Sequence, residues 1–321
     1  MSNINPVIVS VCTLAYNQAE YIKEAIDGIL KQKTTFRFEI IIHDDCSTDG
    51  TRDIVIEYQK RYPDIITLIL PHENQYSKGI DMFCKCVRQA RGKYIAWCEG
   101  DDMWTDINKL QIQVDYLEKH PECSLVYTNT DIFIEKENRI ERNALTSGFI
   151  NPPKIFKEHL MNAGHLAPLT WAFRKECFVY NSKRYVDWSY SIALDLFANG
   201  EVHFLDKTTA LYRVFNQSVS HSKTINDLLK FGKGIIEIKE IYYRRYSNLL
   251  SHIDIQKIRN HTYIKYLPAA IATADNDFIK KAKASCKESH NYVWGTIILL
   301  RYILGLKYIF QWIYKQKGRT V

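Results

Sequence analysis

The sequence predicts an α/β fold in which helices flank a mostly parallel central sheet, with a helical extension at the C-terminal end. From residue 7 to about residue 134, short β-branched runs alternate with longer segments of helical periodicity. Continuous apolar strands separated by helices are typical of parallel sheets that are covered on both faces. The strict alternation stops after residue 135, and from residue 226 the sequence is helical and basic.

Five strands are predicted, and each is a short run of β-branched and other apolar residues. Pro71 ends the third strand, because proline has no backbone N–H to donate to a neighbouring strand. The predicted strands cover residues 7–14, 38–43, 65–70, 94–98 and 125–134.

Four helices are predicted between these strands. The first places Ile22, Ile26 and Ile29 on one face, which is the spacing of an amphipathic helix. The second ends before Pro63, since the residue that precedes a proline disfavours helical backbone. The predicted helices cover residues 19–31, 51–61, 80–90 and 108–120. The charge run 135–142 is expected to be solvated, and residues 149–153 form a predicted loop.

Composition excludes a disordered chain and indicates where the protein acts. The 321 residues are 46% hydrophobic and 25% charged, which is ordinary for globular proteins. The formal charge of +7 is uneven, because the acidic clusters lie in the first half and the C-terminal third is rich in Lys and Arg. Aromatic residues lie among those basic ones, which favours an anionic membrane surface as partner over nucleic acid.

The eight cysteines and the N-terminal segment predict a cytoplasmic protein. The cysteines show no paired zinc spacing, because Cys84 and Cys86 are too close together for the usual two-residue knuckle. Reduced, structural thiols are therefore expected. The apolar run 7–11 is too short for a signal peptide and lacks a basic lead-in.

Polar side chains follow three of the predicted strands, at residues 15–17, 44–49 and 99–102. Ligands of parallel α/β sheets bind beyond the carboxyl ends of the strands, so we expect these side chains to converge on one site. Because side chains alternate along a strand, Asp101 and Asp102 should face different partners. One natural pair of partners is a ribose hydroxyl and a divalent metal, since carboxylates bind hard cations such as Mg²⁺ or Mn²⁺.

Three ordered segments carry a specific resemblance to a known family. Residues 9–17, 40–51 and 92–104 together resemble the motifs of family 2 glycosyltransferases with the GT-A nucleotide-sugar-binding fold. The resemblance covers roughly residues 7–221. It implies an enzyme that binds a nucleotide-sugar, with UDP favoured, and a divalent metal on the diphosphate, either Mn²⁺ or Mg²⁺.

The resemblance also implies individual roles. Asp45 would hydrogen-bond the base, Asp101 would lie near the ribose, and Asp102 would bind the metal. Glu99 stands where many relatives carry Asp, so its part in metal binding is an open question, and Cys46 stands where many carry Gly. The nucleotide pocket would be lined by Thr13, Ala15, Tyr16 and Asn17. Asp49 is expected to cap the helix that begins at Thr51.

The resemblance places the acceptor chemistry in the following residues. Asp187 would be the general base that deprotonates the acceptor hydroxyl in an inverting transfer, with Asp195 in reserve. Capping of a helix marked by Trp188, Ile192 and Leu196 is the other role open to Asp187. Arg213 would pair with phosphate or with a sheet carboxylate. His221 would assist the diphosphate or lie at the surface, and Phe215 replaces the usual family His.

Residues 292–314 are apolar and aromatic, and Arg301, Lys307, Gln311 and Lys315 form a narrow polar stripe along them. A membrane-spanning helix would bury two of these charges, whereas a helix lying in the membrane interface would not. We therefore expect peripheral attachment to the inner face of the cell membrane. A helix that packs on the protein core and a partner-binding helix are the alternatives.

The expected protein is thus an inverting glycosyltransferase of surface polysaccharide synthesis, acting on a hydroxyl of a saccharide or lipid-linked oligosaccharide. A GT-A domain at 1–225 would hold the nucleotide-sugar half at about 1–135 and the acceptor half at about 136–225. The helical region with its amphipathic basic tail would follow at 226–321. A sugar-phosphate nucleotidyltransferase is one alternative, although residues 15–18 are not the Gly-rich phosphate loop it would carry. A non-enzymatic nucleotide- or sugar-binding module is the other.

Overall fold

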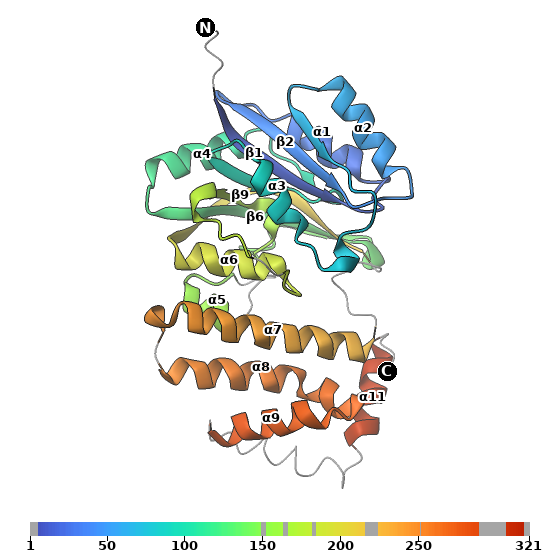
Figure 1. The fold of residues 1–321 in the computed structure, drawn as a ribbon, viewed down its shortest axis with the longest axis vertical. Helices are drawn as coiled ribbons and strands as arrows, with labels where there is room; N and C mark the ends of the chain where they lie inside the picture. Colours follow the sequence, from blue (N-terminus) through green and yellow to red (C-terminus); the bar gives the residue numbers. More distant parts are fainter. Residues whose placement is uncertain are drawn as a thin grey trace. The chain divides into compact units, whose positions relative to one another are not determined.

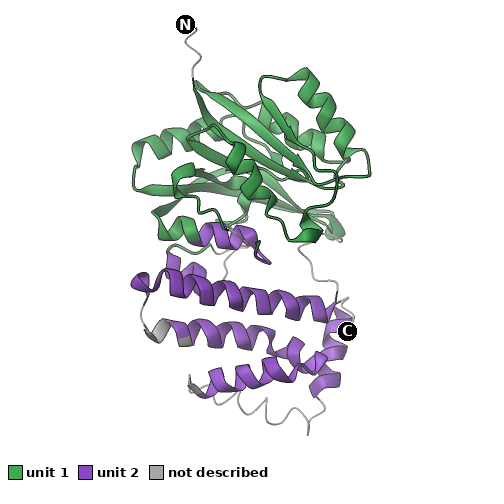
Figure 2. Ribbon diagram, in the orientation of Figure 1, with its two compact units in different colours: residues 1–155, 165–184, 195–215 green, residues 156–164, 185–194, 216–321 purple. Residues whose placement is uncertain are grey.

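The structure is a computed structural model that describes residues 6–148, 152–162, 166–181, 184–215, 224–250, 252–288 and 306–317. Contacts divide the chain into two compact units, drawn in different colours in Figure 2. The first unit comprises Met1–Ile155, His165–Arg184 and Asp195–Phe215. The second comprises Phe156–Gly164, Tyr185–Leu194 and Asn216–Val321, so it also takes in two segments that lie before the expected boundary at residue 225.

A mixed, mostly parallel sheet forms the centre of the first unit (Figure 1). Its order is β3-β2-β1-β4-β8-β6-β9-β5, with β7 paired to β6. The pairs β1–β2, β1–β4, β2–β3 and β6–β9 are parallel, and the short strand β8 is antiparallel to both β4 and β6. The strands are β1 (Val7–Ala15), β2 (Arg37–Asp44), β3 (Ile66–Ile69), β4 (Tyr94–Trp97), β5 (Met103–Trp104), β6 (Cys123–Ile134), β7 (Arg139–Glu141), β8 (Ala172–Arg174) and β9 (Glu201–Val214).

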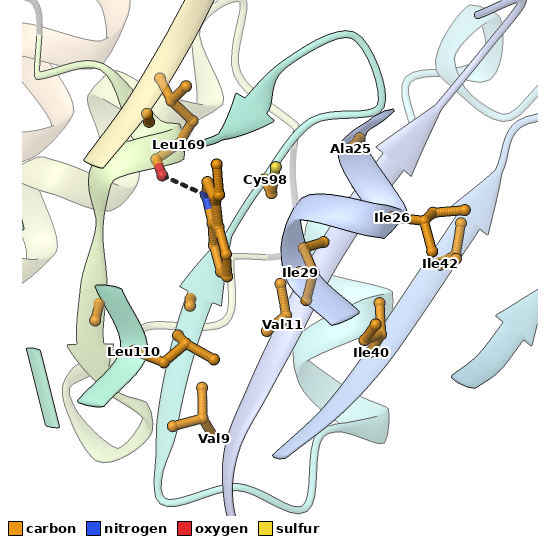
Figure 3. Packing of buried hydrophobic residues seen from close by; sticks show 14 of the residues in the cluster. Val9, Val11, Ala25, Ile26, Ile29, Ile40, Ile42, Cys98, Leu110 and Leu169 are labelled. Carbon is orange, nitrogen blue, oxygen red and sulfur yellow. Dashed lines mark hydrogen bonds between the residues drawn. The ribbon is translucent and has the colours of Figure 1, made fainter. Parts of the chain in front are cut away.

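Helices cover both faces of this sheet, as its continuous apolar strands predicted. On one face, α1 and α4 contribute to a core cluster with the inward side chains of β1, β2 and β4 (Figure 3). On the other face, Phe83 of α3 stacks on Trp97 of β4 with ring centroids 3.9 Å apart. The helices of this unit are α1 (Ile22–Leu30), α2 (Thr51–Arg61), α3 (Met82–Gln89) and α4 (Lys109–Lys119).

The nine elements predicted up to Ile134 are all present, with ends that differ by three residues or fewer. The charge run 135–142 is exposed apart from the half-buried Glu141, as predicted, and its residues 139–141 form β7 at the edge of the sheet. Charged residues are common on edge strands, where they oppose further strand pairing, so a charge run and a strand are compatible. The 14-residue strand β9 was not predicted, because its buried and half-exposed positions do not alternate regularly. Residues 149–151 of the predicted loop 149–153 lie outside the described residues.

The second unit is helical. Its core cluster joins α7, α8, α9 and α11 around buried residues such as Ile225, Leu267 and Phe278. Thr224 begins α7 with a capping box, in which its hydroxyl accepts from the Asp227 amide at 3.0 Å. The helices are α5 (Phe156–Asn162), α7 (Ile225–Arg245), α8 (His252–Thr273), α9 (Asn276–Glu288) and α11 (Leu306–Gln316). The helix α6 (Trp188–Ala198) belongs to this unit up to Leu194.

The predicted tail helix is described only in its last part, α11. Tyr314 of this helix is buried against the core cluster of the second unit, and Phe310 packs against it. The alternative of a core-packing helix therefore holds for this side of α11. Across the described ranges, none of the helices combines the length and hydrophobicity needed to cross a bilayer.

Candidate functional site

The carboxyl ends of β1, β2 and β4 meet at one edge of the sheet, as their parallel pairing requires. Ala15 lies opposite Asp44 in the β1–β2 register, and the carbonyl oxygen of Ala15 accepts from the Asp45 amide at 2.9 Å. On the other side of β1, the carbonyl oxygen of Leu14 accepts from the Gly100 amide at 2.9 Å. The three polar loops that follow these strands are thus joined by backbone hydrogen bonds.

Three carboxylates converge in the loop after β4. Glu99, Asp101 and Asp102 each offer an oxygen, and these oxygens lie within 4.8 Å of one another. The lack of a side chain at Gly100 leaves room for Gln18 and Ile22, since a Cβ there would lie 2.4 Å from Gln18 Oε1 and 2.8 Å from Ile22 Cδ1.

This group requires a counter-charge. Asp102 is only 1% exposed, and burial, followed by repulsion from Asp101 and Glu99, raises its pKa well above the usual range. Burial also raises the pKa of Asp101. Three oxygen ligands in a partly open acidic loop match the ligand preference of Mg²⁺ and Mn²⁺.

Arg213, at the end of β9, reaches this acidic loop. Its backbone N–H donates to Asp102 Oδ1 at 3.2 Å, and its Nη1 donates to the carbonyl oxygen of Asp101 at 2.8 Å. Its Nη2 forms an ion pair with Glu24 of α1. The sequence predicted Arg213 as a partner for phosphate or a sheet carboxylate, but it did not identify Glu24, which lies 189 residues away in the chain. The guanidinium also lies 5.3 Å from the ring centroid of Tyr21, on which Phe215 packs.

Asp45 is bound to the loop that follows β3. Its Oδ1 accepts from the Gln75 amide at 2.7 Å and its Oδ2 from the Tyr76 amide at 2.9 Å. Asp45 is 1% exposed and both of its oxygens bind backbone amides, so its role toward a base stays a prediction. The neighbouring Cys46 has a φ of 63°, a left-handed conformation that glycine adopts more readily than other residues.

Hydrogen bonds join the loop after β1 to the loop after β2. The Asn17 amide donates to Ser47 Oγ at 2.9 Å, and Asn17 Oδ1 accepts from the Thr48 amide at 2.9 Å. Asp49 accepts from the amides of Ala19 and Thr51 at 2.9 and 3.0 Å, so it binds the first residue of α2, although the N-cap position is Gly50 and not Asp49 as predicted. Of the other predicted pocket residues, Thr13 and Ala15 are buried, whereas the Tyr16 ring is 46% exposed.

Asp187 belongs to the second unit, where it caps α6. Its Oδ1 accepts from the Tyr190 amide at 2.9 Å and from Ser189 Oγ at 2.8 Å. The capping role that the sequence left open is therefore present, while the base role stays a prediction. Asp195 is 1% exposed and accepts from Asn181 Nδ2 at 3.4 Å. His221 lies outside the described residues.

One buried cation near the acidic loop was missed by sequence reasoning. Lys109, at the start of α4, is 0% exposed, and its Nζ lies 4.4 Å from the Trp104 ring centroid and 2.6 Å from Gln113 Oε1. Burial lowers the pKa of Lys109 to about 7. Lysine in the first turn of a helix is ordinarily solvated, so no signal in the sequence marked it. Figure 3 shows the surrounding packing and the hydrogen bond to the Leu169 carbonyl, which Trp104 Nε1 donates at 2.9 Å.

Comparison with known proteins gives matches over this same region. A family model described as glycosyl transferase family 2 matches residues 10–179. An uncharacterized protein of Mycobacterium tuberculosis is 34% identical over 222 residues, which is 66% of this chain and 60% of that protein. The Escherichia coli protein WfaP, named a UDP-Glc:alpha-D-GlcNAc-diphosphoundecaprenol beta-1,3-glucosyltransferase, is 28% identical over 67% of this chain and 81% of its own length.

Solved structures share the fold. TarS of S. aureus, crystallised with UDP-GlcNAc, has a TM-score of 0.62 at 18% identity, over 98% of this chain and 93% of that one. The mannosyltransferase PcManGT of Pyrobaculum calidifontis, in complex with GDP-Man and Mn²⁺, has a TM-score of 0.50 at 15% identity, over 94% and 90% of the two chains. The predicted α/β GT-A fold is confirmed by these likenesses.

Proposed function

Because the chain belongs to glycosyl transferase family 2, we propose that it transfers a sugar from a UDP-sugar to a hydroxyl of a lipid-linked saccharide. The observation that carries the proposal is the acidic group Glu99, Asp101 and Asp102 at the joined carboxyl ends of the parallel strands. UDP-GlcNAc is bound by TarS, and a UDP-glucose donor and a lipid-diphosphate acceptor appear in the name of WfaP. The chain matches about 60% of the length of the mycobacterial relative, so the activity of the whole protein is part of the proposal.

The proposal includes a divalent cation, Mn²⁺ or Mg²⁺, bound by Asp102 with the support of Glu99. The three carboxylate oxygens and the raised pKa values of Asp102 and Asp101 support this assignment. Such a cation neutralises the charge that grows on a departing nucleoside diphosphate, an effect worth several kcal/mol. Asp101 is assigned to the ribose hydroxyls. Arg213, which donates to the Asp101 carbonyl oxygen, holds this loop in position.

We assign the general base to Asp187. Its Oδ1 caps α6, so we place the proton of the acceptor hydroxyl on Oδ2. The acceptor oxygen then bonds to the anomeric carbon as the bond from that carbon to the diphosphate oxygen breaks, and the configuration inverts. The resemblance of residues 185–195 to the base-supplying stretch of inverting family members supports this assignment.

Peripheral attachment to an anionic membrane completes the proposal. Tyr308, Ile309 and Trp312 of α11 are 73%, 46% and 62% exposed, on the side away from buried Tyr314. Exposed Lys307 and Lys315 lie on the same helix. Aromatic side chains flanked by lysines are suited to the interface between headgroups and acyl chains. A lipid-linked acceptor at the inner face of the membrane would be within reach of an enzyme held there.

Nucleotide release tests the proposal. With UDP-glucose, Mn²⁺ and an undecaprenyl-diphosphate-linked saccharide, free UDP should appear only when donor and acceptor are both present. Asp102→Asn should abolish the Mn²⁺-dependent release while the circular dichroism spectrum is unchanged. Full activity of this variant would contradict the metal assignment. Binding of UDP-sugar with no release under any condition would indicate a binding module, and release of diphosphate from a nucleoside triphosphate would indicate a nucleotidyltransferase.

A further inference from the structure

A second group of metal-binding side chains lies in the first unit, at the amino-terminal ends of β6 and β9. His120, Glu122 and His203 each offer a ligand atom, and these atoms lie within 4.8 Å of one another. Glu201 lies beside this group of three, with its Oε2 2.7 Å from His203 Nε2. The four side chains thus form two imidazole–carboxylate pairs, the other being His120 Nδ1 with Glu122 Oε1 at 2.9 Å.

The backbone under this group is held firmly. Glu201 donates its amide to the Glu122 carbonyl oxygen at 2.9 Å, which sets the two carboxylate-bearing positions side by side. Gly200 allows this approach, because a Cβ there would lie 2.7 Å from Ser124 Cβ and 2.9 Å from the Glu122 carbonyl oxygen. The buried Arg174 donates to the carbonyl oxygen of His120 at 3.0 Å. The backbone positions that carry these side chains are therefore fixed by the fold, while the side chains themselves are accessible, with 39% and 44% of His120 and Glu122 and 22% and 64% of His203 and Glu201 exposed.

Tyr116 orients both imidazole rings. Its ring stacks on that of His120 with centroids 4.2 Å apart, and its hydroxyl lies 2.9 Å from His203 Nδ1. The two imidazole rings lie edge to face, 5.9 Å apart. A hydrogen bond to one ring nitrogen fixes the orientation of a histidine and is the usual partner of a metal bond at the other nitrogen.

We propose that His120, Glu122, Glu201 and His203 bind a zinc ion that joins the end of α4 to the start of β9. Two imidazole nitrogens favour zinc over Mg²⁺ or Ca²⁺, which prefer oxygen ligands. In a tetrahedral site with bonds of 2.0–2.1 Å, ligand atoms lie about 3.3 Å apart. Within each pair the two ligand atoms, now at hydrogen-bond distance, would move apart by about 0.5 Å, and the two pairs would close toward each other from separations of up to 4.8 Å. Its charge would balance those of the two glutamates.

This site is separate from the acidic group of the proposed reaction. His203 and Arg213 lie ten residues apart on the same strand, a span of about 33 Å at 3.3 Å per residue. Arg213 contacts Asp101 and Asp102, so the two groups lie near opposite ends of β9. Zinc bound by His120, Glu122, Glu201 and His203 would therefore stabilise the fold without entering the transfer reaction.

Titration of the full chain without a polyhistidine tag tests the proposal, with Zn²⁺ as the ligand and excess Mg²⁺ present to occupy the acidic group. We expect one zinc ion per chain, and binding weakened more than 10-fold in both His120→Gln and His203→Gln. Tyr116→Phe, which keeps the ring but removes the hydroxyl, should weaken binding by about 10-fold. His72→Gln, at an exposed histidine elsewhere in the same unit, is the matched control and should bind as the wild type does.

Co²⁺ gives a second readout, because its visible absorption distinguishes tetrahedral from octahedral coordination. The wild type should show the tetrahedral bands, and His203→Gln should lose them while its metal-free circular dichroism spectrum and melting curve stay those of the wild type. Unchanged nucleotide release by His203→Gln would show that the site is separate from the reaction. The proposal would be overturned by a wild type that binds no zinc in this assay, or by histidine variants that bind it as tightly as the wild type.

Discussion

Replacement of the buried Lys109 by methionine should stabilise the first unit at neutral pH. Burial lowers the pKa of Lys109 to about 7 from an ordinary value of 10.5. A lysine with a lower pKa in the folded state opposes folding at every pH at which the unfolded chain carries the charge. This destabilisation is absent above pH 10.5, grows as the pH falls, and reaches its full size below about pH 7.

The magnitude follows from this shift. A pKa that is lower by about 3.5 corresponds to a cost of almost 5 kcal/mol for charging Lys109 in the folded state, at about 1.36 kcal/mol for each pH unit. The variant also loses the cation–π contact with Trp104 and leaves Gln113 Oε1 without its lysine partner, which together cost about 2–4 kcal/mol. We therefore expect a net gain of about 1–3 kcal/mol in the free energy of unfolding at pH 7. The gain should shrink by about 1–2 kcal/mol at pH 8.5, because folded Lys109 is then largely neutral.

Urea unfolding followed by tryptophan fluorescence measures this difference, because Trp97 and Trp104 are both buried in the core of the first unit. Comparison of variant and wild type at each pH isolates Lys109. The buried Cys12 thiol, whose pKa burial raises, contributes to both proteins, whereas the Cys98 thiol interacts electrostatically with Lys109, so its change is part of the measured Lys109 effect. Lys109→Leu is a second apolar variant, and it separates the effect of removing the charge from a packing effect that is specific to methionine. A loss of stability in both variants, with the same difference at pH 7 and pH 8.5, would refute the reasoning.

Three further predictions test the site and the tail. Asp187→Asn keeps an oxygen that can cap α6 but cannot take a proton, so kcat should fall about 10²–10⁴-fold while helix content is kept; an unchanged kcat would rule out the base role. Gly100→Ala should weaken UDP-sugar and Mn²⁺ binding and lower stability by about 1–3 kcal/mol, because the new methyl group would overlap Gln18 and its neighbours. Wild-type affinities measured by calorimetry in that variant would contradict the packing argument. Trp312→Ser should reduce sedimentation with anionic phosphatidylglycerol vesicles several-fold, whereas Tyr76→Ser, at an exposed aromatic of the first unit, should leave it unchanged. Equal losses in the two variants would argue against a specific role for α11.

The parts of the fold that depend on local pattern were predictable. Strands β1 to β4 are continuous apolar runs, and α1 shows a clear amphipathic spacing, so neighbouring residues alone determine their type. The convergence of the loops after β1, β2 and β4 follows from parallel pairing, which the alternation of elements implies. The acidic group at Asp101 and Asp102 was predictable for the same reason.

The parts that depend on distant residues were not predictable. The ion pair between Arg213 and Glu24 joins residues far apart in the chain, and no local pattern identifies the partner. The same holds for Asp45, whose bonds to the amides of Gln75 and Tyr76 depend on how the loop after β3 folds back. For Asp187 the sequence allowed two roles, because a carboxylate at the start of a helix suits a cap and a base equally well.

The hydrogen bonds between the loops after β1 and β2 have a consequence for how the protein tolerates change. Asn17 uses its amide and its side-chain oxygen on residues 47 and 48, while Asn17 and Cys46 both hold left-handed backbone conformations. The two loops therefore form one rigid surface before any nucleotide binds, and binding incurs little entropic cost for ordering them. It also follows that the two loops are energetically coupled. The effects of Asn17→Ala and Ser47→Ala on stability and donor affinity should be non-additive, so substitutions that alter one loop should need compensation in the other.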